Sequence, residues 1–315
     1  MLPYLLRRFA IGATTFFVVT GLSFLLLFAR GGLAIAADLT PENLRTLEAV
    51  TLKAEQLGLD RAIPVQYFDW LSHLLRGDLG TSFGSGVEVA NILSVRIPVT
   101  VSLAITTLVL MTTVGVFLGV LAARRGGLLD KAVQAMSVAM TAVPAYWLAL
   151  VLVIIFSLNL GLFPATGFIP VTQSFPGWLS TVALPTVALA LGPSFVLAVW
   201  IRSSIVDMQR SDFVRTLRAR GISDHVVMYR HVLRNASAPS AQLLGLMIIT
   251  ILGGTIIVER VFALPGIGTM TMNAGLVSDI PVVLGGITFF VAVITVINVA
   301  VDVVVALLNP KVRIS

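Results

Sequence analysis

Residues 211–234 read SDFVRTLRARGISDHVVMYRHVLR and lie between two long apolar stretches, Leu179–Ile201 and Ala241–Val258. The segment begins with serine and aspartate, turns basic, and repeats this order after Gly221. Serine and aspartate are favoured where helices begin, and glycine commonly ends them in a left-handed conformation. Basic residues near a helix end complement the helix dipole. The pattern predicts two short helices joined at Gly221.

The first predicted helix has Ser211 at its N-cap and Asp212 at its first position, and the second begins in the same way with Ser223 and Asp224. We expect Ile222 to pack against the first turn of the second helix as a hydrophobic staple with Val227. One face of the second helix is apolar and consists of Ile222, Val226, Tyr229 and Leu233. An interfacial helix on acidic lipid explains the arginines, but a rigid, capped helix with acids and an apolar face favours protein docking.

The composition places these helices in a membrane protein. Apolar residues make up 57% of the 315 residues, and charged residues only 11%, against about 25% in soluble chains. This balance excludes a cytosolic enzyme, a nucleic-acid-binding domain and a disordered chain. A bilayer span needs about 20 apolar residues. Six stretches qualify: Phe9–Phe28, Val99–Ala122, Ala132–Leu158, Leu179–Ile201, Ala241–Val258 and Val282–Leu308.

The distribution of lysine and arginine sets the orientation. With the N-terminus inside, inner segments hold 14 of the 21 basic residues, seven of them arginines between 202 and 234. This asymmetry predicts that both termini are cytoplasmic. Arg7, Arg8 and Ala34-Ile35-Ala36 resemble a signal peptide, but the apolar run between them exceeds the 7–15 residues of a signal core. We therefore expect a retained first span.

Residues 29–96 form a polar outer segment after the first span. Thr40-Pro41-Glu42 indicates a helix start, and Gly58 a helix end. A second helix is expected from Pro64 to Arg76, with Gly77 after it. Its predicted apolar face consists of Val65, Phe68, Leu71 and Leu75. The segment either seals the outer ends of the spans or docks a soluble partner, and both can hold together.

Other features bear on chemistry. The chain has no cysteine, and none of its lysines lies in a phosphate-binding GxxxxGK[ST] loop. The three histidines have no partner at a spacing that suits a metal site or a catalytic triad. Pro144, Pro185 and Pro193 permit kinks in or beside spans, for bundle packing or for flexing around a path.

Several motifs in order resemble the oligopeptide/dipeptide permeases of ABC importers. The inner loop is similar to that subfamily's form of the EAA region, with Gly221 and Leu233 at the glycine and leucine of the pattern. Arg215, Thr216 and Leu217 replace Glu-Ala-Ala, His231 replaces Ile, and Arg234 replaces Pro. The further matching pieces are RGDLGTSF (76–83), RIP (96–98), VPAYW (143–147), LP (184–185), LALG (189–192), ERVF (259–262), PGIG (265–268) and NPKVR (309–313).

The resemblance implies an all-α polytopic fold with six transmembrane helices and a type I permease core. The expected parts are an N-terminal helix with its outer insertion (1–96), a five-helix core with a coupling loop at 202–240 (97–308), and a cytoplasmic tail (309–315). It also implies a bacterial or archaeal cytoplasmic membrane and partners: a second homologous permease, two cytoplasmic ATPases and an extracytoplasmic substrate-binding protein, but no nucleic acid. ATP and magnesium would bind the ATPases, and this chain would bind no cofactor.

The resemblance further implies site residues. The ATPase-coupling set is Asp212, Arg218, Gly221, Ser223, Asp224, Tyr229, Arg230 and Leu233. The outer gate or translocation path would include Glu259, Pro265, Gly266 and Gly268. Asp302 is the acid well inside a span, where charges are costly and often functional; pairing and a substrate-path role are both open. We expect no catalytic or metal-binding residue.

Other functions remain as alternatives. An intramembrane enzyme would need HExxH, a paired aspartate motif or an in-span Ser/His pair, and none is present. A self-sufficient secondary transporter often shows duplicated halves and in-span charges, and the chain has little of either. Within the permease reading, a nickel chelate, an oligosaccharide or a modified peptide is an alternative to a peptide substrate.

Overall fold

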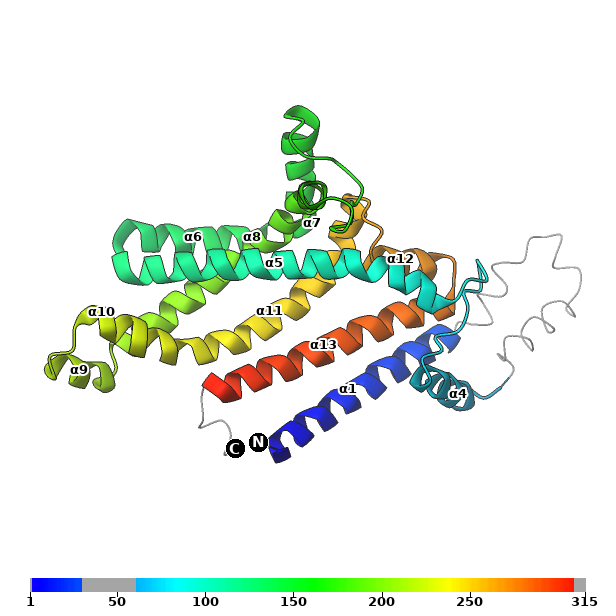
Figure 1. Cartoon of the computed structure of the whole chain (residues 1–315), viewed down its shortest axis with the longest axis horizontal. Helices are drawn as coiled ribbons and strands as arrows, with labels where there is room; N and C mark the ends of the chain where they lie inside the picture. Colours follow the sequence, from blue (N-terminus) through cyan, green and yellow to red (C-terminus); the bar gives the residue numbers. More distant parts are fainter. Residues whose placement is uncertain (1, 30–60, 309–315) are drawn as a thin grey trace, which may run out of the picture. The chain divides into compact units, whose positions relative to one another are not determined.

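The computed structural model of the chain describes residues 2–29 and 61–308. The regular structure of these residues is helical, with one isolated bridge between Thr81 and Glu88 (Figure 1). The helices, including two π-helical segments labelled η, are α1 (Leu2–Ala29), α4 (Ile63–Leu75), α5 (Val89–Arg125), α6 (Gly127–Ala142), α7 (Ala145–Leu152), η2 (Val153–Asn159), α8 (Phe175–Gln209), α9 (Asp212–Ala219), α10 (Asp224–Val226), η3 (Val227–Val232), α11 (Leu233–Val261), α12 (Ile267–Leu276) and α13 (Ile280–Leu308).

The helices confirm an all-α polytopic membrane protein. Five of them are long and apolar enough to cross a membrane, and a bent pair brings the number to six if it is one span. Five predicted spans correspond to α1, α5, α8, α11 and α13. The helix predicted between Thr40 and Gly58 lies outside the described residues.

The third predicted span, Ala132–Leu158, is not one helix. It is broken after α6, and the axes on either side of the break differ by 97°. Val143 is extended, and Pro144 precedes α7. Proline has no N–H for the helical hydrogen bond, and it disfavours a helical residue before it. The sequence indicated a kink at Pro144, but the prediction of a continuous span was wrong.

The described chain forms two compact units. One consists of residues up to 9, Pro98–Gly266 and residues from 296, and the other of Ala10–Ile97 and Ile267–Thr295. Each unit is therefore discontinuous in sequence. The division at residues 96 and 97 proposed from the sequence stays a prediction.

In the unit that contains Pro98–Gly266, α5 and α6 run side by side, and α8 packs against both at an angle (Figure 1). Helices α5 and α8 approach closely because small residues lie between them. A Cβ on Gly119 would come within 2.7 Å of the Ala198 carbonyl oxygen, so only glycine allows this spacing. The buried side chains of α8 form the centre of this unit and meet α7 and α11 along their length.

In the unit that contains Ala10–Ile97, the helix expected from Pro64 to Arg76 is present as α4, and Gly77 follows it at φ +82°. The apolar face expected for this helix is mostly exposed, since Phe68 is 65% exposed and Leu75 is 78% exposed, whereas Leu71 is buried. Instead Tyr67 packs on Phe24 with ring centroids 5.5 Å apart. The Tyr67 hydroxyl also lies 3.0 Å from the Thr20 hydroxyl. The face of α4 that contains Tyr67 and Trp70 therefore packs against Phe24.

The motif at 76–83 in the same unit is held by an acid that precedes α13. The buried Asp279 carboxylate accepts hydrogen bonds from the Ser82 hydroxyl and from the Phe83 amide, the latter at 3.0 Å. This contact spans almost 200 residues of sequence. It explains why the loop before α5 has a defined conformation.

Candidate functional site

The first helix of the inner loop forms where the sequence predicts it. Helix α9 begins at Asp212, and Ser211 occupies the N-cap position. The capping role of the Ser211 side chain was wrong, because its hydroxyl donates to the Met208 carbonyl at 2.7 Å. Asp212 instead pairs with Arg215 at 3.3 Å on the exposed side of the helix.

Gly221 ends α9 as predicted. Its φ of +77° lies in the left-handed region that glycine favours. The Gly221 N–H donates to the Arg218 carbonyl at 2.9 Å, and the Ile222 N–H donates to the Leu217 carbonyl at 3.3 Å. This pair of bonds is the Schellman arrangement. It turns the chain sharply and directs it into the second helix.

The second helix begins at Asp224 but does not end before the next span. It passes from α10 through η3 into α11 without a break, so the predicted separate helix at about Ser223–Arg234 was wrong. The Ser223 side chain makes no capping hydrogen bond in the described part of the chain. Val227 and Val232 are both buried, and their five-residue spacing matches the i to i+5 bonds of a π-helix. The wider turn places both valines on the core.

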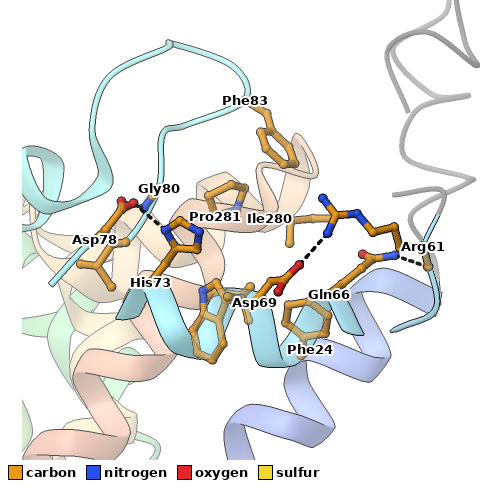
Figure 2. A pocket seen from close by; sticks show the side chains of 13 residues that line it. Phe24, Arg61, Gln66, Asp69, His73, Asp78, Gly80, Phe83, Ile280 and Pro281 are labelled. Atoms are coloured by element: carbon orange, nitrogen blue, oxygen red, sulfur yellow. Dashed lines mark hydrogen bonds and ion pairs between the residues drawn. The ribbon is translucent and has the colours of Figure 1, made fainter. Parts of the chain in front are cut away.

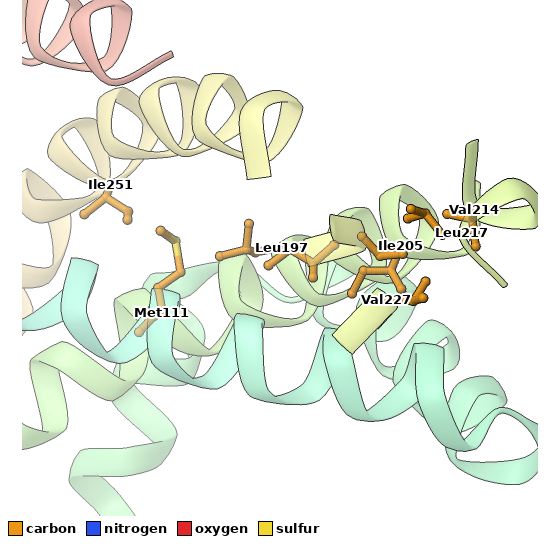
Figure 3. Close-up of a cluster of buried hydrophobic side chains, with 10 residues drawn as sticks. Met111, Leu197, Ile205, Val214, Leu217, Val227 and Ile251 are labelled. Atoms are coloured by element: carbon orange, nitrogen blue, oxygen red, sulfur yellow. The ribbon is translucent and has the colours of Figure 1, made fainter. Parts of the chain in front are cut away.

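The paired helices are packed onto the spans. Val214 and Leu217 of α9 and Val227 of η3 share a cluster with Ile205 and Leu197 of α8, as Figure 3 shows. Ile222 and Leu233, two of the predicted apolar face, pack against this cluster. Val226 and Tyr229, the other two, remain 38% and 44% exposed. The loop is therefore rigidly attached and still presents apolar side chains.

A polar network joins the loop to the end of α5. Arg124 Nη1 donates to the Tyr229 hydroxyl at 2.6 Å, and the Arg124 guanidinium lies 5.5 Å from the centroid of the Tyr229 ring. The His225 ring is 4.6 Å from the same ring. Arg218 Nε donates to Asp224 at 2.8 Å across the Gly221 turn. These side chains line a cavity of about 280 Å³.

The exposed side of this element combines charge and apolar surface. Phe213, Val226 and Tyr229 are exposed, as are the acids Asp212 and Asp224 and the base Arg230. Such a mixture on a rigid support suits protein docking, since aromatic and arginine side chains dominate interface energetics. The coupling set predicted from the sequence thus lies together on α9, α10, η3 and the start of α11. Its role stays a prediction.

The predicted outer-gate residues lie at the end of α11 and beyond. Glu259 is fully buried and accepts a hydrogen bond from the Thr100 hydroxyl at 2.6 Å. Its carbonyl accepts from the Leu264 N–H at 2.7 Å, which closes a tight turn before Pro265. A Cβ on Gly266 would overlap the Glu259 carboxyl group. Gly268 is buried in the first turn of α12, in the other unit.

A second cavity, of about 300 Å³, lies in the unit that contains α4. Figure 2 shows Phe24, Phe83 and Pro281 on its walls and two polar side-chain contacts, one from Arg61 and one from His73. Arg61 pairs with Asp69 at 2.7 Å, and His73 Nδ1 lies 3.0 Å from Asp78. Asp78 Oδ1 also accepts from the Gly80 N–H at 2.8 Å. This bond, followed by the His73 contact, lowers the pKa of Asp78 below its ordinary value.

Three interactions were missed by sequence reasoning. Arg202 of α8 binds Asp130 of α6 through two nitrogens, with Nε at 2.8 Å. The other two are the Arg124–Tyr229 and Ser82–Asp279 contacts. Asp130 and Asp279 are acids beside apolar spans, and this position alone could have marked them as side chains that need a partner. The sequence does not identify the partners Arg202 and Ser82, because they lie more than 70 residues away along the chain.

The predicted in-span acid Asp302 belongs to α13, but its side chain lies outside the described residues. Within the described ranges, no three His, Asp or Glu side chains are grouped so that they could hold a metal ion.

Matches to known proteins cover both the N-terminal part of the chain and the part that follows it. Residues 115–314 match the family of binding-protein-dependent transport system inner membrane components, and residues 1–104 match the N-terminal region of such membrane components. The chain is 36% identical to a putative peptide transport system permease protein of Brucella abortus (strain 2308), over 99% of both chains. It is 30% identical, over the full length of both, to the dipeptide transport system permease protein of Lactococcus lactis subsp. cremoris.

Proposed function

Because the chain belongs to the family of binding-protein-dependent transport system inner membrane components, we propose that it is the permease subunit of an ATP-driven importer for oligopeptides or dipeptides. The peptide substrate is carried over from relatives that are named peptide or dipeptide permeases. Their similarity extends over the whole chain, which favours a common architecture.

The proposed partners are a second homologous permease, two cytoplasmic ATPase subunits and an extracytoplasmic substrate-binding protein. ATP and magnesium bind the ATPases, and this chain supplies the path. The asymmetry of basic residues supports an orientation with both termini in the cytoplasm and residues 202–240 facing the ATPases.

One observation carries the mechanism: the docking element is continuous with a span. Helices α10 and η3 extend into α11 without a break, while α9 is fastened to α8 by Val214 and Leu217. A movement of the ATPases against Phe213, Val226 and Tyr229 is therefore passed directly to α11 and α8. We infer that ATP binding draws the two docking elements together and turns the spans from an inward-facing to an outward-facing arrangement. Hydrolysis then returns them, which is alternating access.

The first test is to purify the chain from its native membrane in mild detergent and to identify the co-purifying proteins by mass spectrometry. A second permease, ATPases and a substrate-binding protein are the expected result. Recovery of a well-folded chain without them would contradict the proposal and favour a self-sufficient transporter. The complete complex, reconstituted in liposomes, then allows ATP-dependent peptide uptake to be measured.

A further inference from the structure

The break in the third span leaves backbone groups without helical partners. In a continuous helix the N–H groups of residues 145–147 would donate to the carbonyls of residues 141–143. In the described part of the chain these groups make no hydrogen bond across the break. The Val143 N–H donates to the Met140 carbonyl at 3.3 Å, and the Leu148 N–H donates to the Pro144 carbonyl at 3.1 Å.

A cavity of about 400 Å³ lies at this break and is bounded by α8 and α11. Thr141, Val143 and Ala145 line it from the break. Gly192, the middle residue of α8, lines it opposite, about 25 Å from either helix end at 1.5 Å per residue. A Cβ on Gly192 would lie 3.5 Å from the Met140 carbonyl oxygen. The cavity is therefore at mid-membrane depth, and a small residue keeps it open.

The break is not covered by the described part of this chain. Thr141, Ala142 and Pro144 are all exposed. Unpaired backbone groups at this depth are tolerated only where they are buried in protein or line a water-filled cavity. The adjoining cavity supplies the second condition.

The chemistry of the lining defines what it binds. The Thr141 hydroxyl donates to the Ser137 carbonyl at 2.8 Å, and the Thr250 hydroxyl donates to the Leu246 carbonyl at 3.2 Å, so both offer acceptor lone pairs to the cavity. The other side chains that line it are apolar, two of them methionines, or absent, and none in the described part of the chain is charged. The site thus selects neither sign of charge. The carbonyls before the break and the N–H groups after it are the complement of a peptide backbone.

We propose that the break at Val143-Pro144 is a solute-binding site on the translocation path, where the carbonyls of Thr141 and Val143 accept hydrogen bonds from the backbone N–H groups of a transported peptide. This inference rests on the proposed function and deepens it, because it names the contacts and the part of the substrate that they read. Broken spans form substrate and ion sites in other transporters, where freed backbone carbonyls coordinate cations and half-helix N-termini face substrate groups. Peptides of different side chains are accepted because only their backbone is bound by polar contacts.

The first test fills the cavity. Gly192→Leu is compared with Gly253→Leu, a matched change at a nearby span glycine that does not line the cavity and has open space around it. In the complete transporter in liposomes, Gly192→Leu should lower peptide uptake roughly tenfold or more, as single side-chain changes in substrate pockets do. Stimulation of ATP hydrolysis by the loaded binding protein should persist. Wild-type uptake in Gly192→Leu, or equal losses in both variants, would overturn the site.

The second test measures whether water reaches the break, and it does not depend on ATP-driven uptake. The chain has no cysteine, so Thr141→Cys and Val138→Cys each introduce a unique thiol, the latter at a 75% exposed residue of α6 outside the cavity. A charged methanethiosulfonate should label Thr141→Cys, with protection by added peptide, and should leave Val138→Cys unlabelled. An unlabelled Thr141→Cys means that another chain covers the break and refutes the site. If Thr141→Cys is labelled but the wild-type complex shows no ATP-dependent peptide uptake, the result counts against the proposed function and not against the site.

Discussion

Arg124, at the end of α5, donates a hydrogen bond to the hydroxyl of Tyr229, 2.6 Å away and 105 residues further along the chain. The bond fastens η3 to a span that is not its neighbour in sequence. A force applied to Tyr229 therefore reaches α5 as well as α11. In the proposed importer this contact divides the motion of the docking element between two spans.

Loss of this contact should weaken coupling rather than folding. Tyr229→Phe removes the hydroxyl but keeps the ring under the guanidinium, whereas Tyr229→Ala removes both. The cation–π term at an exposed site is worth about 0.5–1 kcal/mol, so the alanine variant should be the more impaired. The measurement is peptide uptake per ATP hydrolysed in liposomes. Arg124→Gln removes the guanidinium that makes both contacts, so it should resemble Tyr229→Ala more than Tyr229→Phe. Arg125→Gln, at the adjacent exposed arginine, serves as the control. Identical ratios in all four variants would rule out a coupling role.

Gly221→Val should uncouple ATP hydrolysis from uptake. The left-handed conformation costs a residue with a Cβ roughly 1–2 kcal/mol, and a β-branched side chain is strained further. Relief of this strain opens the Schellman turn and displaces α10 from α9. Gly221→Asn provides the matched comparison, since asparagine tolerates this conformation better than other non-glycine residues. We expect uptake to fall much more in the valine variant at equal complex assembly. Equal uptake in both would show that the turn is not needed for docking.

The sequence predicted those parts of the fold that depend on the residues of a single helix. The length of the apolar stretches located five spans, and the Ser-Asp and Gly221 signals located α9 and its end. The π-helical turn at Val227–Val232 was not predictable, because it follows from burial of two valines against α8 rather than from local preference. The same holds for the packing of Tyr67 and Trp70 of α4 on Phe24 and for the 97° angle at Pro144. Proline predicts a break in the helix, but the packing around it determines the angle between the two helix axes.

The Arg202–Asp130 pair should be important for stability. Both side chains are mostly buried, and the guanidinium binds both carboxylate oxygens. Removal of one partner of a buried pair leaves an uncompensated charge, at a cost of about 3–5 kcal/mol. We expect Asp130→Asn and Arg202→Gln each to lower the unfolding temperature in detergent. The double variant should be less destabilised than the sum of the two, since neither charge then remains alone. Strict additivity would mean that the pair contributes little.

The outer segment should lose stability in acid through Asp78. The pKa of this carboxyl group is lowered in the folded chain by the Gly80 N–H and then by His73. A lowered folded-state pKa gives stabilisation that is complete above the unfolded value of about 3.9 and is lost as the pH falls through the folded value. Proteolysis of the loop at 76–88 should therefore rise below about pH 4 in the wild type. Asp78→Asn should be more susceptible at neutral pH and should change little in acid. A parallel acid response in the variant would assign the loss to another group.

The buried carboxyl group of Glu259 should make position 266 intolerant of any side chain. A Cβ there overlaps the Glu259 carboxyl group, which is held by Thr100 and enclosed on all sides. Gly266→Ala must therefore push Glu259 from its site or open the turn that the Leu264 N–H closes. Overpacking of this kind costs about 1–3 kcal/mol. We expect a lower unfolding temperature and reduced uptake.

A second substitution tests this steric explanation. Glu259→Asp shortens the side chain by one carbon, so the Gly266→Ala/Glu259→Asp double variant should recover part of the loss that Gly266→Ala causes. Thr100→Val removes the hydroxyl but makes no space, so it should not rescue Gly266→Ala. Recovery of this kind would establish steric contact between the two positions as the reason that glycine is needed, and its failure would point to the conformation of the turn itself.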